Sequence, residues 1–226
     1  MTKIIMVLGR KVFFCVVALG DDVMSLTKSL VSSHVATGFE KSSARSVDDT
    51  TKNPYIVRMM ADLERIRMEI VNVFGIMELS ALRAMEKKIG INDLKYPLEK
   101  PEGDVANDGR EIPKHTMGDR IGLVSLQDLQ EWSRANNVLR AEMSGDSVKA
   151  LEERIASFSA SRGWTYSKYG LALSLRAEYG ELCGCLEYVD LEKELHPEVV
   201  GKICMELADV FIYSIHCRNL LQKVDE

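Results

Sequence analysis

The sequence predicts an all-α fold, and three observations support this prediction. The chain of 226 residues contains five prolines, so few positions force a helix to end. Its long runs rich in Leu, Glu, Ala, Met, Lys and Arg favour helices. Over residues 54–89, apolar residues recur at three- and four-residue intervals, which is the period of an amphipathic helix. Hydrophobic residues at 46% and charged residues at 28% are typical of a folded globular protein.

Charge and cysteine content narrow the classes of function. The 29 Lys and Arg residues against 34 Asp and Glu residues give a net charge of −5, which excludes a global basic field for a nucleic-acid backbone. Five cysteines in a chain of this length indicate reduced, buried thiols in a reducing compartment. The chain has no run of about 18 apolar residues, so we expect no membrane span. We expect a cytoplasmic protein without polymeric nucleic acid or membrane as a partner.

The first 53 residues leave two interpretations open. The apolar run Val12–Leu19 follows several basic residues, as in a cleaved leader of about 50 residues, which would place the protein in mitochondria or in the secretory pathway. The same run can pair with Ile4–Leu8 as a β-hairpin around Gly9. The polar residues 43–53 predict a linker in either case.

Residues 54–145 predict a helical extension. The apolar periodicity of residues 54–89 predicts two helices, with a break near Gly75 and a second helix over 81–88. Three prolines and three glycines among charged residues predict an exposed loop over 94–119. A further helix is expected over about 125–143.

Residues 146–226 predict a third region of three helices. We expect them over 147–161, 171–191 and 197–221, with Pro197 at a first helical position, where proline is favoured.

Two acidic pairs stand out in the last two of these helices. Glu178 and Glu181 are three residues apart, as are Glu206 and Asp209, so each pair lies on one face of its helix. The 24 residues between the pairs suffice for a turn between two helices, which can bring the four carboxylates together. Converging carboxylates among apolar residues repel one another unless they share a cation. Oxygen ligands favour Mg²⁺ or Mn²⁺, and Mg²⁺ commonly shares its ligand shell with phosphates.

The sequence segments around these acids match a known pattern. The two pairs read as ExxE and ExxD, and Phe158, Arg162 and Trp164 match a Phe-xxx-Arg-x-Trp stretch. The segment from Glu206 to Tyr213 is close to ELADVLIY. On these motifs, residues 147–226 resemble the MazG-like and dCTP pyrophosphatase group of all-α nucleoside triphosphate pyrophosphohydrolases. The resemblance covers about the last third of the chain.

This resemblance implies a MazG-like helical bundle and a Mg²⁺-dependent enzyme. It would hydrolyse a nucleoside triphosphate between the α and β phosphates, releasing the monophosphate and pyrophosphate. Glu178, Glu181, Glu206 and Asp209 would hold the metal, and one of them would orient or deprotonate the attacking water. The substrate would be dCTP or a modified deoxynucleotide in nucleotide-pool cleaning. Relatives are dimers or dimers of dimers, so the resemblance also implies a homodimer or homotetramer.

Aromatic residues near the motifs are candidates for binding the nucleotide. The resemblance implies that Trp164 and Tyr188 flank the base, with Phe158 in the same stretch. Tyr213, four residues after Asp209, lies on the same helical face and would contact sugar or phosphate. Core packing is the alternative for each of these aromatic side chains.

Two departures from the family pattern keep further alternatives open. Relatives continue into a fourth helix with Lys and Asn residues that contact phosphate, whereas this chain stops soon after residue 221. Either the helices of residues 54–143 replace that helix, or the phosphate contacts are lost. Ile155 stands where pyrimidine-reading relatives have a polar residue, which weighs against a preference for dCTP. A related pyrophosphohydrolase that acts on dUTP or phosphoribosyl-ATP is the alternative from the same class. A non-catalytic scaffold or assembly subunit is the alternative from a different class. Candidate substitutes for the phosphate contacts are Lys168, Lys193 and Lys202.

Overall fold

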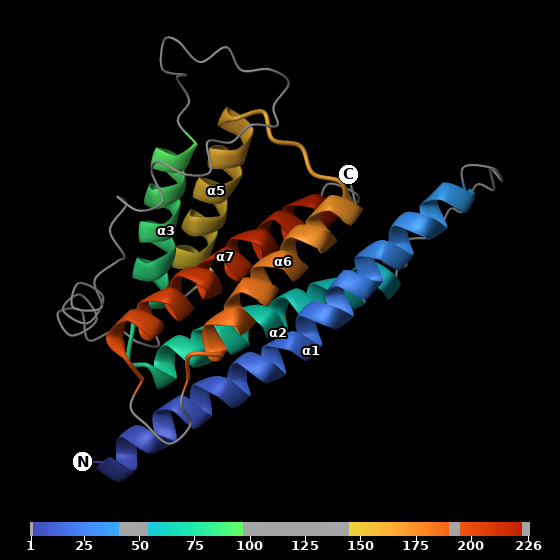
Figure 1. Cartoon of the computed structure of the whole chain (residues 1–226). Helices are drawn as coiled ribbons and strands as arrows, with labels where there is room; N and C mark the ends of the chain where they lie inside the picture. The colour runs from blue at the N-terminus through green and yellow to red at the C-terminus, as the bar shows by residue number, and fades with distance from the viewer. Residues whose placement is uncertain (1, 41–53, 97–144, 190–194, 223–226) are drawn as a thin grey trace.

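The computed structural model describes residues 2–40, 54–96, 145–189 and 195–222. These residues form six helices and no strand, so the all-α prediction is confirmed for the described part of the chain. Figure 1 shows their arrangement. The helices are α1 (Thr2–Glu40), α2 (Pro54–Ile76), α3 (Ala81–Lys95), α5 (Gly145–Ser161), α6 (Lys168–Leu186) and α7 (Pro197–Gln222).

Helix α1 corrects the prediction of a β-hairpin in the first 20 residues. The segments 4–8 and 12–19 belong to one continuous helix of 39 residues, which passes through Gly9 without a turn. Its fully buried side chains are spaced by three or four residues, a helical period, and they are Val12, Val16, Leu19, Val23, Leu26 and Leu30. The leader interpretation stays a prediction, and cleavage of a leader of about 50 residues would remove all six of these side chains from the core.

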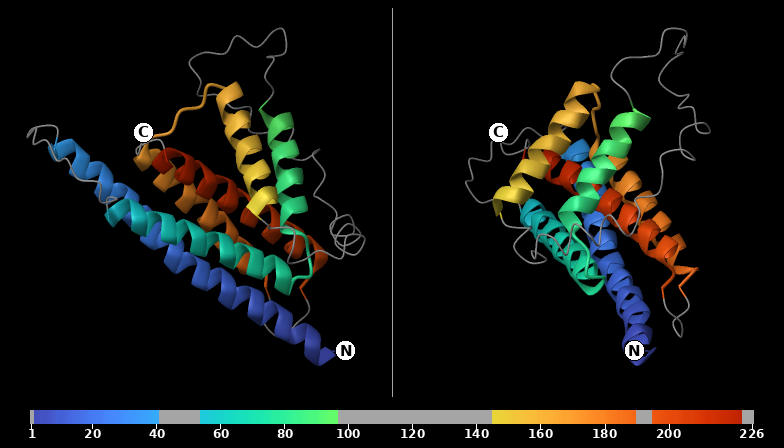
Figure 2. Two further views of the ribbon diagram at one scale, coloured as in Figure 1. Left: turned by 180° about the vertical axis from the view of Figure 1, so that it is seen from behind. Right: turned by 90° about the vertical axis from the view of Figure 1, so that its left-hand side faces the viewer.

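Four helices form the main bundle. Helix α1 packs against α2 and α6, and α7 packs against the same two helices, so that the four enclose a common core (Figures 1 and 2). The largest fully buried side chains include Leu26 of α1, Ile66 and Phe74 of α2 and Phe211 of α7. Burying the apolar face of each helix against its neighbours supplies most of the stability of such a bundle.

Polar contacts fix α1 against α2 and α6. The fully buried Asp62 of α2 accepts a hydrogen bond from Ser25 Oγ at 3.0 Å and pairs with Arg65, which also reaches Asp22 at 2.7 Å. On the other side, the hydroxyl of Tyr179 in α6 donates to the carbonyl of Val16 at 3.1 Å. Buried polar groups paired in this way set the register of the helices as well as their contact.

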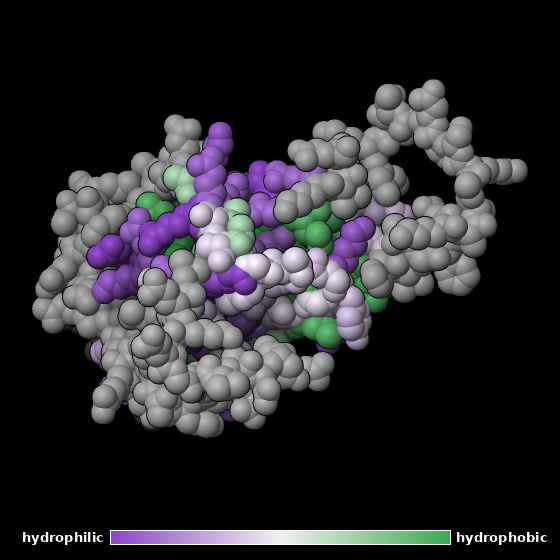
Figure 3. Space-filling view, turned by 90° about the horizontal axis from the view of Figure 1, so that it is seen from above, coloured by the Kyte–Doolittle hydropathy of each residue, from purple (hydrophilic) through white to green (hydrophobic). Residues whose placement is uncertain are grey.

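Helices α3 and α5 pack together against α7, on the side of the bundle away from α1 (Figure 2). The turn between α2 and α3 uses a left-handed backbone at Glu78, with φ of 56°. Ser80 then caps α3, because its side chain accepts a hydrogen bond from the Arg83 amide at 3.0 Å. Viewed from above, the described surface is largely hydrophilic or near neutral, with smaller hydrophobic areas (Figure 3).

Most helix predictions are confirmed, with shifts at the ends. The break after Gly75 occurs as expected, and α7 begins at Pro197. Helix α6 begins at Lys168 because Ser167 caps it, accepting from the Gly170 amide at 2.9 Å, and it ends at Leu186, earlier than residue 191. Helix α3 continues to Lys95, beyond the predicted end at residue 88, and includes the first two residues of the predicted loop 94–119. Residues 97–119 of that loop, the helix over 125–143 and the linker 43–53 lie outside the described residues.

Among the described residues, none of the helices is long and apolar enough to cross a bilayer. The five cysteines are free thiols, and Cys185, Cys204 and Cys217 are buried as expected, whereas Cys15 and Cys183 are only partly buried.

Candidate functional site

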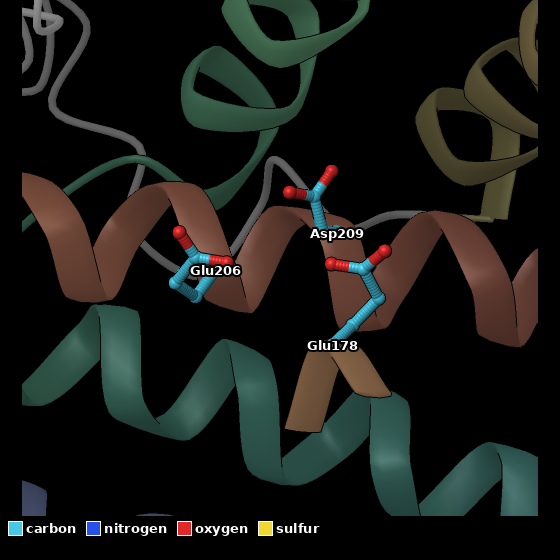
Figure 4. A group of neighbouring side chains, drawn as sticks. All are labelled: Glu178, Glu206 and Asp209. Atoms are coloured by element: carbon cyan, nitrogen blue, oxygen red, sulfur yellow. The ribbon is translucent and has the colours of Figure 1, made fainter. Parts of the chain in front are cut away.

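Helices α6 and α7 bring three carboxylates together. Glu178 projects from α6 toward Glu206 and Asp209 of α7, and the three side chains face one another (Figure 4). One oxygen of each carboxylate lies within 4.8 Å of those of the other two. Glu206 and Asp209 share a face of α7 because they are three residues apart. Glu181, the fourth acid of the predicted set, is exposed and lines the same cavity, but does not belong to this close group.

These acids are held in an environment that disfavours their charge. Burial, followed by the charges of Asp209 and Glu181, raises the pKa of Glu178 to about 7. Burial also raises the pKa of Glu206 to about 7, although Lys88 opposes the shift. The pKa of Asp209 is raised by burial too. In addition, Glu206 Oε2 is buried and accepts no hydrogen bond from a described residue. A divalent cation fits this donor set, because it would satisfy the orphaned oxygen and offset the repulsion.

A lysine from α3 faces the acids. Lys88 Nζ lies 2.5 Å from Asp209 Oδ2, and both side chains are mostly buried, with 16% and 13% exposed. Burial, the largest single influence, lowers the pKa of Lys88, but the charge and hydrogen bond of Asp209 together with the charges of Glu206 and Glu178 outweigh it. The pKa is therefore raised, and the lysine stays charged. Asn92 and Lys95 line the same cavity and follow Lys88 at helical spacing.

Sequence reasoning missed these three residues and expected phosphate contacts at Lys168, Lys193 or Lys202. The available signal was their helical spacing within residues 81–95, but nothing in the sequence shows which helix α3 contacts.

The acids and the lysine line a cavity of about 190 Å³ between α3, α5, α6 and α7. Its remaining wall is largely aromatic. Tyr96 and Phe158 each make an edge-to-face contact with Trp164, with ring centroids 5.1 Å and 5.4 Å apart. Trp164 is 38% exposed, so part of its ring remains accessible. The cavity therefore combines charged and aromatic surfaces.

Comparison of the chain with models of protein families, with curated proteins and with solved structures finds no match.

Arg162 holds the aromatic wall in place. Its side chain is 8% exposed and donates to the carbonyl of Tyr96 at 2.7 Å, to that of Phe158 at 3.1 Å and to Asp93 at 3.0 Å. Its guanidinium also lies 3.7 Å from the centroid of the Phe158 ring. These contacts join the end of α3 to the end of α5, so the guanidinium fixes the two segments that carry Tyr96 and Trp164.

His216 forms a neutral part of the cavity wall. Its ring lies 4.7 Å from that of Tyr166 and 5.9 Å from that of Tyr213, between ring centroids. Ser159 Oγ lies 3.4 Å from His216 Nε2. Burial lowers the pKa of His216 to about 4, so the imidazole carries no charge at neutral pH.

The structure brings some predicted substrate-binding residues to the cavity and not others. Phe158, Trp164 and Tyr213 line it. Tyr188 does not line the cavity, because α6 ends at Leu186. Its side chain is 69% exposed, and Lys202 Nζ lies over its ring, 5.6 Å from the ring centroid. Lys168, the first residue of α6, also lies outside the lining, and Ile155 contributes apolar wall. Lys193 lies outside the described residues.

Proposed function

We propose that this protein is a Mg²⁺-dependent nucleoside triphosphate pyrophosphohydrolase of the MazG-like group, which cleaves a (d)NTP to the monophosphate and pyrophosphate. One observation carries the proposal: Glu178, Glu206 and Asp209 converge within 4.8 Å in a cavity that also contains Lys88 and aromatic rings. Carboxylates, cations and aromatic surface are the three groups that metal, phosphate and base require.

Glu178, Glu206 and Asp209 would hold the metal, and Mn²⁺ would serve in place of Mg²⁺. When bound, the ion supplies positive charge to the phosphate oxygens and lowers the pKa of a coordinated water. Glu181 is exposed at the cavity and lies outside the close group, so it is the carboxylate best placed to orient or deprotonate the attacking water.

Lys88, Asn92 and Lys95 would bind the phosphates. The ammonium of Lys88 is charged and mostly buried, which strengthens its attraction for a phosphate oxygen. In the structure, this ammonium forms an ion pair with Asp209. Binding of a metal ion to Asp209 would free the Lys88 ammonium to contact the phosphate chain. This role for α3 supports the alternative in which helices of residues 54–143 replace the fourth helix of relatives.

The aromatic wall would receive the base. An accessible aromatic face stacks a base with about 1–3 kcal/mol, and Trp164 offers such a face. We propose dCTP or a modified deoxynucleotide as substrate, with nucleotide-pool cleaning as the role. The related substrates dUTP and phosphoribosyl-ATP are distinguished by the same assay.

The test is pyrophosphate release from a panel of nucleoside triphosphates by the full-length protein, with Mg²⁺, with Mn²⁺ and with neither. We expect metal-dependent release with a preference for one base. Glu178→Gln and Asp209→Asn should each lower the rate by about 100-fold or more, because each removes a metal ligand. Glu153→Gln, which changes an exposed acid of α5, is the matched control and should keep the wild-type rate.

Lys88→Met separates phosphate binding from metal binding. It should lower pyrophosphate release strongly, while Mn²⁺ titration shows equal or tighter binding because the acids lose a competing cation. Unchanged release by this variant contradicts the phosphate role. Silence of the folded wild-type protein over the whole panel contradicts the enzyme and favours the non-catalytic scaffold.

A further inference from the structure

Helix α1 carries two apolar faces, and the bundle uses one of them. The buried face repeats at alternating spacings of four and three residues, from Val12 to Leu30. The opposite side of the helix has a second set with the same alternation. We call this set the outer stripe, and it consists of Phe14, Val17, Asp21, Met24, Lys28 and Val31.

The outer stripe is open to solvent in the single chain. Phe14 is 65% exposed, Val17 48%, Met24 46% and Val31 36%, and Asp21 and Lys28 are also exposed. Helix α1 lies at the outer edge of the bundle, so no described helix covers this side (Figures 1 and 2). Two apolar faces with this spacing are typical of a helix that packs against partners on both sides.

Helix α6 widens the stripe into a larger surface. Tyr169 and Leu173 are 49% and 50% exposed, and they line a groove of about 890 Å³ together with Met24 and Val31. Contiguous exposed apolar side chains of this kind mark an interaction surface rather than ordinary solvated surface.

The charges within the stripe are spaced so that they can pair with those of a second copy of the helix. Asp21 precedes Met24 by three residues and Lys28 follows it by four, while Val17 and Val31 lie seven residues away on either side. If two copies of α1 cross antiparallel with a two-fold axis at Met24, Asp21 of each copy meets Lys28 of the other, and Val17 meets Val31. A two-fold interface requires such self-complementarity. The stripe itself carries one acid and one base, and Arg58 and Arg176 also line the groove beside it.

We propose that the outer stripe of α1, flanked by Tyr169 and Leu173, is the docking surface for a second copy of this chain. The two copies are antiparallel along α1, with Met24 at the two-fold axis. This surface lies on the side of the bundle away from α3 and α5, which form part of the cavity wall, and none of the residues of the outer stripe lines the cavity. The dimer therefore leaves the cavity of each copy open.

The mass of the full chain in solution tests this proposal, measured by light scattering or sedimentation at tens of micromolar protein. We expect a dimer. Met24→Lys places two like charges at the axis and should raise the dissociation constant at least about tenfold. Met68→Lys is the matched control, because Met68 is a methionine of α2 with 57% exposure outside the stripe, and it should leave the dimer intact. Circular dichroism checks that each variant keeps its helices.

A charge exchange tests the antiparallel pairing itself. Asp21→Lys and Lys28→Asp should each weaken the dimer, and the double variant should restore it because both pairs exchange sign together. A monomeric wild-type chain, or a Met24→Lys variant that dimerises normally, overturns the proposal. A double variant no stronger than the single ones also overturns it. None of these readouts depends on pyrophosphate release, so a failure here is separate from a failure of the proposed enzyme.

Discussion

Glu178 and Glu206 keep their protons to a higher pH in the folded protein than in the unfolded chain. Their pKa rises from 4.5 to about 7, so the folded state binds more protons than the unfolded state between these two values. Their contribution to stability is therefore fully present below the unfolded pKa and is lost as the pH rises through about 7. Burying these acids therefore costs the folded protein stability at neutral pH.

This linkage predicts the pH dependence of the metal-free protein. We expect the melting temperature in chelator to fall from about pH 5 to about pH 8, with a loss on the order of 1 kcal/mol per carboxyl after solvent screening of these partly exposed groups. Glu178→Gln should reduce the slope and raise the melting temperature at the upper end of the range. Scanning calorimetry measures both effects, with Glu153→Gln as control. A variant with the wild-type slope would remove Glu178 as the source.

The close acids could be predicted from the sequence, whereas their cationic partner could not. The spacing of Glu206 and Asp209 fixes a shared face within one helix, which is local information. Lys88 comes from a helix more than 100 residues earlier, and its approach depends on how α3 docks on α7. The family resemblance placed Tyr188 beside the base, but α6 ends at Leu186 and Tyr188 does not line the cavity.

At the scale of elements, α1 and α6 approach each other closely at Gly20. A Cβ atom built on Gly20 would lie 2.1 Å from the hydroxyl oxygen of Tyr179 and 2.6 Å from its Cζ. Only glycine leaves room for this ring, whose hydroxyl reaches the carbonyl of Val16. Tyr179 is the neighbour of Glu178, so this contact helps to fix the rotation of α6 that turns the acid toward α7.

Gly20→Ala should therefore destabilise the protein by about 1–3 kcal/mol, as overpacking does. Gly184→Ala is the matched control: it lies in α6 with no atom within 4 Å of its added Cβ, and should raise stability by about 0.5–1 kcal/mol. Urea unfolding measures both. Adding Tyr179→Phe to Gly20→Ala removes the nearest atom and should recover part of the loss. Equal stability of the two alanine variants would contradict the close approach.

The β-hairpin prediction for the first 20 residues was wrong because local conformational preference and tertiary packing disagree there. β-branched and aromatic residues dominate positions 4–17, and these residues favour strands when no neighbours are considered. Their spacing from Val12 to Leu30 fits a helical face, and packing against α2 and α6 decides in favour of the helix. The helices of residues 54–89 were predicted correctly because preference and periodicity agree.

At the scale of the whole molecule, the helices of the described residues share one core. Buried side chains from α1, α2, α3, α5, α6 and α7 form a single contiguous cluster. The division into residues 1–53, 54–145 and 146–226 stays a prediction, and it places Lys88 and the acids that it faces in different regions.

Hydrogen exchange distinguishes one cooperative unit from several. If the core unfolds as one unit, the amides of residues 12–30 in α1 should be protected to the same free energy as those of residues 200–217 in α7. Native-state exchange followed by mass spectrometry measures this for the full chain. Much faster exchange of α1 would mean that it opens separately and that the candidate site can persist without it.

The hydrogen bond from Tyr179 to Val16 spans 163 positions of the chain. During synthesis, α1 leaves the ribosome long before α6 and α7 exist, and α2 is the first helix able to cover its apolar residues. At the slowest translation rates, of about 5 residues per second, synthesis of the chain from Val16 to Tyr179 takes on the order of half a minute. A nascent chain with both faces of α1 uncovered is a natural client for chaperones. Slow translation between residues 76 and 168 would lengthen that exposure, whereas early docking of α2 would shorten it.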